Sequence, residues 1–204
     1  MNAVTPPAVI LAAGFSSRLG RPKALVRVRT LSLLRRTILL VARFAPAQII
    51  VVLPRGAARL RLEARGPYAR GIRVIFAVNP RRAEGLSSSV RCGIVRARCS
   101  PALLLLPVDL PALRQRDLAR LIAHWRSARR CLIARRIGPH GGVPLILPRW
   151  LYARALAVRG DVGLRHLVGD LPPSQRKLLD LPSAILDVDT PQDLRAARRA
   201  PSRF

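Results

Sequence analysis

Short apolar runs alternate along the chain with segments of helical spacing. The runs are rich in Val, Ile, Leu and Ala, and Gly or Pro closes most of them, as is typical of buried strands; they cover residues 9–13, 48–53, 72–78 and 102–106. A helix is predicted from Leu31 to Phe44, because its apolar residues recur every three or four positions. This alternation predicts an α/β fold with a mostly parallel, doubly wound sheet.

The pattern continues beyond the first four runs. Residues 57–71 predict a short helix and a loop, and residues 131–135 predict a short strand. Between them, a helix is predicted over residues 117–129, with four apolar side chains facing inward, namely Leu118, Leu121, Ile122 and Trp125.

The end of the chain predicts a last strand and a capped helix. The strand begins at Ala184, and alternation along it places Asp187 and Asp189 on one face. Thr190 is a natural N-cap, Pro191 suits the first helical position, and Asp193 stands in the capping-box position. These caps explain the start of the helix but not the two acidic residues on the strand before it.

Length and composition favour one folded domain. The chain has 204 residues, of which 50% are hydrophobic, so it can form a full core and is not a disordered chain. We expect a single domain over residues 1–194, followed by a basic tail over residues 195–204.

The charge of the chain is extreme, with a formal value of +27, and only Lys23 and Lys177 are lysines among the 37 basic residues. Arginine is scattered along the whole chain and aromatic residues make up only 4%, which is not the stacking surface of a single-stranded nucleic-acid binder. We interpret the charge as compositional drift that also favours phosphate substrates, and we retain a basic nucleic-acid binder as an alternative.

The cysteines and the apolar runs suggest a location. Cys92, Cys99 and Cys131 are odd in number and lack C-x-x-C spacing, so they predict free thiols in a reducing compartment. No basic region precedes the first apolar run, and no run reaches transmembrane length. We therefore expect a cytoplasmic protein that has no membrane partner.

The first apolar run leads into a loop suited to an anion. Within residues 14–23, two glycines, two hydroxyls, two arginines and a lysine follow one another. Gly14 and Gly20 can adopt positive φ and let the backbone approach a phosphate, while Arg18 and Lys23 add positive charge. The spacing is not that of a P-loop, and an ordinary Gly-rich turn with solvated charges is the alternative.

Two further stretches carry candidate chemistry. Ser87, Ser88 and Ser89 are good N-caps for a helix that starts near Val90, or a second anion contact at its N-terminus. Asp109 follows the buried run over 102–106, at the strand end where open α/β sheets bind ligands. Its carboxylate suits Mg²⁺, with a cap for the helix beginning near Arg116 as the alternative.

The first loop resembles the signature of the MobA-like nucleotidyltransferases. The stretch reads Leu11-Ala12-Ala13-Gly14-x-Ser16-x-Arg18-x-Gly20-x-Pro22-Lys23. The form with Ser16, Pro22 and Lys23 is most similar to molybdenum cofactor cytidylyltransferases, whereas guanylyltransferase relatives usually have a Gly-rich pair and Asp-Lys there. The resemblance implies a three-layer α/β/α Rossmann-like nucleotidyltransferase fold. It also implies that the loop binds nucleotide, and that Arg18, Lys23 and the downstream Asp109 are catalytic residues.

Downstream motifs follow in the order of the family. Gly85-x-x-Ser88-Ser89 resembles its second nucleotide loop, which implies that these three residues contact the base and ribose. Asp109-Leu110-Pro111 resembles its Asp-x-Pro, and 187–194 resembles its Asp-x-Asp-Thr-Pro-x-Asp-Leu. The resemblance implies a Mg²⁺ site formed by Asp109 with Asp187 or Asp189.

The acceptor motifs depart from the family. Gly142 and Pro144 match an Arg-Gly-polar-Pro segment beside the acceptor, but Gly141 replaces the Arg and Val143 the polar residue. Residues 160–165 resemble the Gly-Asp-x-Gly-Ala-Arg motif, in which Asp161 either caps the next helix or contacts the acceptor. A further departure is Val28-Arg29-Thr30, where relatives usually have a glycine and a short turn.

The resemblance implies a Mg²⁺-dependent transfer of CMP from CTP to molybdopterin, with release of pyrophosphate and a molybdenum hydroxylase as the enzyme that receives the product. No protein nucleophile is required, because the chemistry is positioning and electrostatic stabilisation. The alternatives are the GTP-using guanylyl branch, a phosphorylated sugar or alditol as acceptor, and a protein that binds or inserts molybdenum cofactor without catalysis.

Overall fold

A seven-stranded sheet forms the centre of the molecule. The computed structural model describes residues 5–16, 19–66, 68, 72–160 and 163–199. The strand order is β5-β4-β1-β6-β8-β7-β9, and β8 alone runs antiparallel to its neighbours. The strands are β1 (Ala8–Leu11), β4 (Gln48–Pro54), β5 (Arg73–Asn79), β6 (Ala102–Pro107), β7 (Leu132–Ile137), β8 (His140–Pro148) and β9 (Arg176–Leu179).

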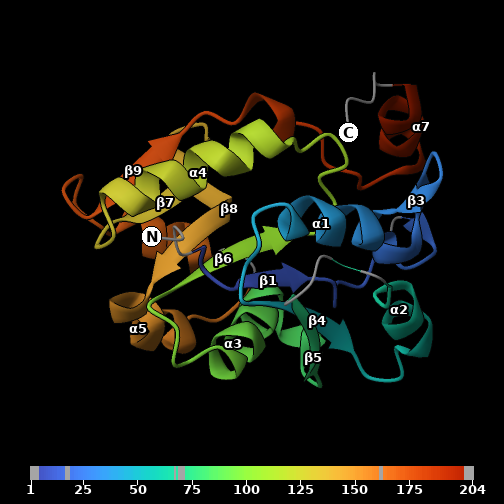
Figure 1. Ribbon diagram of the computed structural model, residues 1–204, viewed down its shortest axis with the longest axis horizontal. Helices are drawn as coiled ribbons and strands as arrows, with labels where there is room; N and C mark the ends of the chain where they lie inside the picture. Colours follow the sequence, from blue (N-terminus) through green and yellow to red (C-terminus); the bar gives the residue numbers. More distant parts are fainter. Residues whose placement is uncertain (1–4, 17–18, 67, 69–71, 161–162, 200–204) are drawn as a thin grey trace.

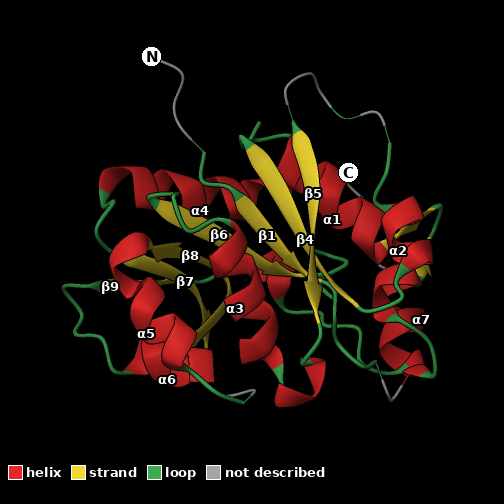
Figure 2. Cartoon of the chain, turned by 90° about the horizontal axis from the view of Figure 1, so that it is seen from below, coloured by secondary structure: helices red, strands yellow, loops and turns green. Residues whose placement is uncertain are grey.

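Helices cover both faces of the sheet (Figure 1). One face carries α1 (Leu33–Ala42), α2 (Ala58–Glu63) and α4 (Gln115–Ser127), whose apolar residues join one buried cluster. The other face carries α3 (Leu86–Arg96), α5 (Tyr152–Ala157) and α6 (Gly163–Gly169), which Figure 2 shows in front of the sheet. The expected three-layer α/β/α architecture is confirmed.

The parallel strands place the predicted loops beside each other. β1 pairs with β4 on one side and with β6 on the other, so the connections leave β1 and β6 in opposite directions across the sheet. Open α/β sheets bind ligands at such a switch point, outside the carboxyl ends of the strands. The loop that follows β1 and the turn that contains Asp109 after β6 therefore share one edge.

Several elements differ from the pattern predictions. The helix predicted from Leu31 begins at Leu33, with the Ser32 hydroxyl accepting a hydrogen bond from the Arg35 amide, and a short hairpin of β2 (Arg27–Val28) and β3 (Leu31–Ser32) precedes it. Its turn places Arg29 at a φ of +59°. Glycine adopts this left-handed conformation freely, whereas a non-glycine residue adopts it at a cost.

The end of the chain also differs. Residues 185–189 form no strand, and the strand of this region is β9, which the apolar pattern did not reveal because Arg and Lys occupy half of it. The predicted caps of α7 (Pro191–Arg199) are confirmed, since Thr190 and Asp193 exchange hydrogen bonds. The helix runs through residues 195–199, which the sequence assigned to a basic tail.

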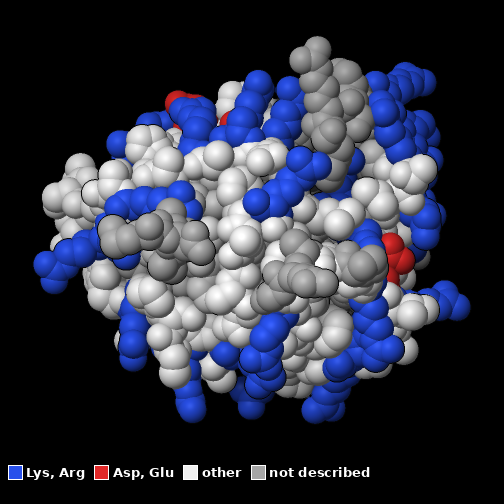
Figure 3. Space-filling model, in the orientation of Figure 1, with Lys and Arg blue, Asp and Glu red and all other residues white. Residues whose placement is uncertain are grey.

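Short one-turn helices complete the described chain: η2 (Lys23–Leu25), η3 (Arg82–Glu84), η4 (Arg149–Leu151) and η5 (Pro182–Ala184). Basic side chains surround the outline of the face shown in Figure 3 and form no single patch on it. Among the described helices, none is long and apolar enough to cross a membrane.

Candidate functional site

The loop after β1 turns back on itself and fixes Lys23. The Ser16 hydroxyl accepts a hydrogen bond from the Lys23 amide at 2.8 Å, and the Ser16 carbonyl accepts one from Leu19 at 3.1 Å. Gly20 has the expected positive φ, +64°, but Gly14 does not. Ser16 takes the second left-handed position instead, at +54°. Arg18 lies outside the described residues, so its expected contact with phosphate stays a prediction.

A cavity of about 370 Å³ opens beneath this loop. Its walls come from the loop itself, from the start of α3 and from the turn after β6. They include eight of the ten residues predicted to bind nucleotide, namely Leu11, Ala12, Ala13, Gly14, Ser16, Lys23, Gly85 and Ser89. The structure thus brings the two predicted nucleotide loops to one cavity, with Asp109 in its wall.

Among the described residues predicted to bind nucleotide, Ser88 alone does not line the cavity. The serines also do not cap α3. The helix begins at Leu86, four residues earlier than predicted, after Gly85 at a φ of +83°. The Asn79 side-chain amide donates to the hydroxyls of Ser88 and Ser89 at 2.8 and 3.0 Å. Ser88 also donates to the Gly85 carbonyl, so its hydroxyl stabilises the loop and does not line the cavity.

Arg82 and Phe15, which the sequence did not single out, also line the cavity. Arg82 places its guanidinium 4.3 Å from the centre of the Phe15 ring, and both side chains line the cavity. A cation over an aromatic face is a favourable contact, and here it joins the first loop to η3. The Arg81-Arg82 pair just before Glu84 was the available signal.

Lys23 links carboxylates from two distant parts of the chain. Its ammonium lies 3.3 Å from Asp109 Oδ2 and donates a closer hydrogen bond to Asp189 Oδ1. Burial lowers the pKa of Lys23, but the hydrogen bond to Asp189 and the charges of both carboxylates more than offset this, so the pKa is raised overall. Lys23 therefore keeps its charge at every physiological pH.

Asp109 does not cap α4, which was the alternative interpretation. The residue before that helix is Arg114, whose amide donates to the Ser183 hydroxyl at 2.8 Å. The Asp109 backbone carbonyl accepts a hydrogen bond from Val188 at 3.0 Å. This bond holds the 185–189 segment beside the turn after β6.

Buried Asp117 anchors the same segment from the other side. It is 1% exposed on α4 and accepts hydrogen bonds from the amide, at 2.9 Å, and the hydroxyl of Ser183. Ser183 belongs to η5, directly before the segment. The position of Asp187 and Asp189 thus depends on packing against α4 and on Asp109, not on a strand.

Asp187 has a different partner from Asp189. Its Oδ1 lies 3.7 Å from the guanidinium of Arg135, which lies in the second half of β7. Burial raises the pKa of Asp187, as do the charges of Asp109 and Asp189, while Arg135 and Lys23 oppose the shift. The charges of Asp109 and Asp189 thus act on Asp187, but among the described carboxylates only Asp109 and Asp189 share the Lys23 ammonium.

Asp109 and Asp189 fit a hard divalent cation. Magnesium is commonly held in proteins by one or two carboxylates, with phosphates and water completing its shell. These two carboxylates already converge on one positive charge, the Lys23 ammonium. Within the described part of the chain, no group of three or more His, Cys, Asp or Glu residues is arranged to hold a metal.

The segment predicted to contact the acceptor lies within the sheet. An added Cβ on Gly141 would lie 2.5 Å from Val168 and 2.8 Å from Leu178, so the arginine of the family pattern does not fit there. Val143 packs against the apolar cluster under α3, α5 and α6. Gly142 and Pro144 are buried in β8, outside the cavity below the first loop. Asp161 lies outside the described residues.

A larger hollow, of about 850 Å³, runs along β5 and α3, away from the carboxylates. Ser88, Cys92 and Cys99 line it, although Cys99 lies beyond the end of α3 and not on the same helix face as Cys92. The three cysteines are free, as predicted. Lys23, Asp109 and Asp189 do not line this hollow, whereas Lys23 and Asp109 line the smaller cavity. We therefore assign the chemistry to the smaller cavity.

Comparisons with known proteins identify a family and structures with a similar fold. The model of the family described as MobA-like NTP transferase domain matches residues 8–176. The crystal structure of Rv0371c from Mycobacterium tuberculosis H37Rv has a TM-score of 0.77 at 26% identity, covering 98% of this chain and 100% of that one. A manganese complex of that protein has a TM-score of 0.72 at 25% identity, covering 97% and 100%.

A more distant structure shares the fold. A molybdopterin-guanine dinucleotide biosynthesis protein A from Archaeoglobus fulgidus has a TM-score of 0.68 at 13% identity, covering 94% of this chain and 96% of that one. No curated protein matches the chain in sequence.

Proposed function

Because the chain belongs to the MobA-like NTP transferase family, and is thus a nucleotidyltransferase, we propose that it transfers CMP from CTP to molybdopterin and releases pyrophosphate. One observation carries the proposal. The nucleotide loops predicted from the sequence line a single cavity, in which Lys23 meets the carboxylates of Asp109 and Asp189. That arrangement suits a triphosphate and its metal.

We place the triphosphate across the first loop. The backbone of residues 11–14 approaches it closely, and the Lys23 ammonium neutralises its phosphates. The bond from the Lys23 amide to Ser16 keeps the lysine at the cavity. Gly85 and Ser89 line the wall that we assign to the base and ribose, and Arg18 is assigned to the phosphates by resemblance alone. CTP is favoured over GTP because the loop carries Ser16, Pro22 and Lys23.

We assign a Mg²⁺ ion, bound with the nucleotide, to Asp109 and Asp189, with Asp187 beside them. Bound there, a divalent cation supplies Lewis-acid stabilisation to the phosphates. The manganese complex of Rv0371c, a relative at 25% identity, supports a divalent cation in this family.

The reaction needs positioning and charge stabilisation from the chain. An oxygen of the acceptor phosphate bonds to the α-phosphorus, and the bond from that phosphorus to the oxygen bridging it to the β-phosphorus breaks, so that pyrophosphate leaves with the electron pair. The Lys23 ammonium stabilises the charge that develops on the phosphates. No covalent intermediate with the protein is required.

A second acceptor class is favoured by one observation. The Gly141–Pro144 segment departs from the family pattern, and the packing around Gly141 excludes the arginine found there in relatives. A phosphorylated sugar or alditol is therefore the alternative acceptor. If the chain binds or inserts molybdenum cofactor without catalysis, it should bind the cofactor and release no pyrophosphate.

The test is a pyrophosphate-release assay with each nucleoside triphosphate, with and without molybdopterin. We expect release that depends on molybdopterin and is faster with CTP than with GTP. A clear preference for GTP would move the protein to the guanylyl branch, and release only with a sugar or alditol phosphate would favour the alternative acceptor. The three free cysteines support a cytoplasmic location, where a molybdenum hydroxylase would receive the product.

A further inference from the structure

A second, basic pocket adjoins the nucleotide cavity. It has a volume of about 500 Å³ and is lined by three arginines, one glutamate and three small residues, namely Arg81, Arg91, Arg159, Glu84, Ala83, Gly85 and Gly160. We call it the arginine pocket. It shares Ala83 and Gly85 with the cavity below the first loop, so the two spaces lie on either side of the same stretch of chain.

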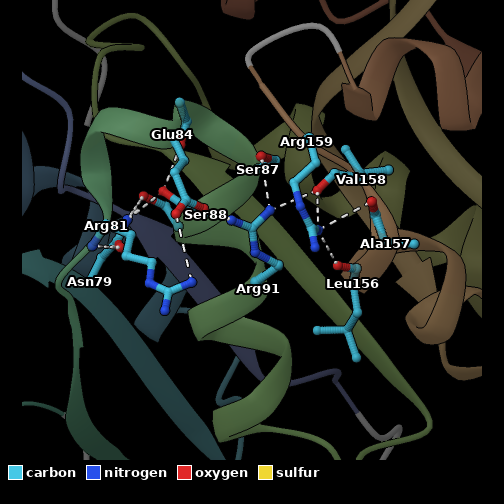
Figure 4. Close-up of polar contacts among 12 residues, drawn as sticks. Asn79, Arg81, Glu84, Ser87, Ser88, Arg91, Leu156, Ala157, Val158 and Arg159 are labelled. Atoms are coloured by element: carbon cyan, nitrogen blue, oxygen red, sulfur yellow. Dashed lines mark hydrogen bonds and ion pairs between the residues drawn. The ribbon is translucent and has the colours of Figure 1, made fainter.

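The charges of the arginine pocket are unbalanced. Glu84 is the only carboxylate in its described lining, and it is shared: one oxygen binds Arg91, and the other lies 3.8 Å from Arg81. Figure 4 shows Arg91 between this group and Arg159. Three guanidiniums against one carboxylate leave a net positive charge in a concave site, which attracts oxyanions.

Two of the arginines are held in place by the fold. The Arg91 side chain is only 18% exposed, and its Nη1 donates to the Val158 carbonyl at 2.7 Å and to the Ser87 hydroxyl at 3.2 Å. Arg159 donates through Nη1 to three carbonyls near the end of α5, including that of Val158 at 3.2 Å (Figure 4). The Val158 carbonyl thus joins both arginines, and the wall is preorganised before a ligand arrives.

We propose that the arginine pocket binds a phosphate-class oxyanion carried by the acceptor substrate, while the nucleotide phosphates bind at Lys23. The inference rests on the proposed function for the identity of the acceptor. Nucleotidyl transfer brings two polyanionic substrates to one site, and each needs its own counter-charge. A second nucleotide or pyrophosphate is the other source of the same chemistry.

The direct test is calorimetric titration of inorganic phosphate, with and without a saturating non-hydrolysable CTP analogue. We expect phosphate to bind with the analogue present. It should bind about tenfold more weakly in Arg81→Ala and in Arg159→Lys, since each variant loses a guanidinium that can donate two charge-assisted hydrogen bonds to the oxyanion. Arg81 is 76% exposed, so its variant leaves the fold intact. Arg116→Ala, which removes an equal charge from the exposed face of α4, should change nothing.

A variant that should strengthen phosphate binding provides a second test. Glu84→Gln removes the carboxylate that competes for Arg81 and Arg91, so phosphate should bind about threefold more tightly. A merely structural arginine cluster would show no gain in this variant. Unchanged phosphate affinity in Arg81→Ala, Arg159→Lys and Glu84→Gln would overturn the proposal.

Steady-state kinetics decide the source of the oxyanion. If it belongs to the acceptor, the same arginine variants raise the KM for molybdopterin about tenfold and leave the KM for CTP unchanged. A change confined to the KM for CTP or to inhibition by pyrophosphate would overturn the acceptor assignment. If the wild-type chain transfers no nucleotide, the proposed function fails, and the phosphate titration still decides whether the pocket binds an oxyanion.

Discussion

The site is built differently before and after Asp109. In residues 5–109, the first half, the backbone of Lys23 and the hydroxyl of Ser88 are held by neighbours close in sequence, Ser16 and Asn79 respectively. In residues 110–199, the second half, residues are fixed across long stretches of chain, as Asp117 holds Ser183. Local contacts therefore shape the loops of the first half, whereas the acidic residues of the second half depend on contacts with distant parts of the chain.

The largest expected effect comes from removing either partner of the ion pair between Lys23 and Asp109. Lys23→Ala and Asp109→Ala should each lower nucleotidyl transfer by about 10²-fold or more, because charge stabilisation of the phosphates is lost. The measurement is the initial rate of pyrophosphate release. Lys177→Ala removes the other lysine, which is exposed on β9, and is the matched control. Near-normal turnover in either site variant would contradict the assignment.

Within the second half, Asp187 and Asp189 can be separated. Asp189→Asn should lower transfer about 30-fold, because Asp189 shares the Lys23 ammonium with Asp109, while Asp187→Asn should lower it no more than about threefold. Both variants remove one charge from the same segment, so each is the control for the other. Equal losses would mean that the contact with Arg135 matters as much as the contact with Lys23.

Stability should reveal the long-range anchoring. Asp117→Ala should lower the free energy of unfolding by about 2 kcal/mol, because the buried amide and hydroxyl of Ser183 lose their acceptor. Denaturant titration measures the change. Asp180→Ala, whose side chain is 77% exposed, should stay within about 0.5 kcal/mol. A loss equal to that control would show that the 185–189 segment is held by other contacts.

The smallest effect tests a strained turn in the first half. Arg29→Gly should raise the free energy of unfolding by about 0.5 to 1 kcal/mol, because glycine adopts the φ of +59° without strain. Burial, together with the charge of Arg29, lowers the pKa of Arg36 to about 10, so losing that charge also relieves repulsion. Arg29→Ala removes the charge but keeps the strain. If Ala and Gly stabilise equally, the turn is not strained.

The same division explains what could be predicted from the sequence. In the first half, the apolar run of β1 and the loop after it identified a cavity wall, because a parallel strand and its loop are local features. Asp109 was found for the same reason, since it directly follows a buried strand. The serine pattern predicts a capped helix near Val90, but α3 begins earlier, after Gly85, and Ser88 and Ser89 accept hydrogen bonds from the Asn79 side chain instead.

The second half was harder because its geometry depends on distant partners. Alternation of apolar residues predicted a strand at 184–189, but the described chain has none there, since hydrogen bonds to Asp109 and Asp117 determine the path. β9 was missed because two of its four residues are basic. The acidic residues were therefore identified by motif, while their separate partners, Lys23 and Arg135, needed the structure.

The ion pairs of Lys23 with the two carboxylates also affect how tightly the site can bind a metal ion. While the Lys23 ammonium is shared by Asp109 and Asp189, a free metal ion must compete with a cation that belongs to the chain itself. If the nucleotide binds at Lys23 as proposed, its phosphates would offer that ammonium new anionic partners and release the two carboxylates. If these carboxylates hold the metal as proposed, nucleotide and metal each raise the affinity of the site for the other, because such coupling is reciprocal. The site would then discriminate against bare metal ions and admit the metal together with its nucleotide.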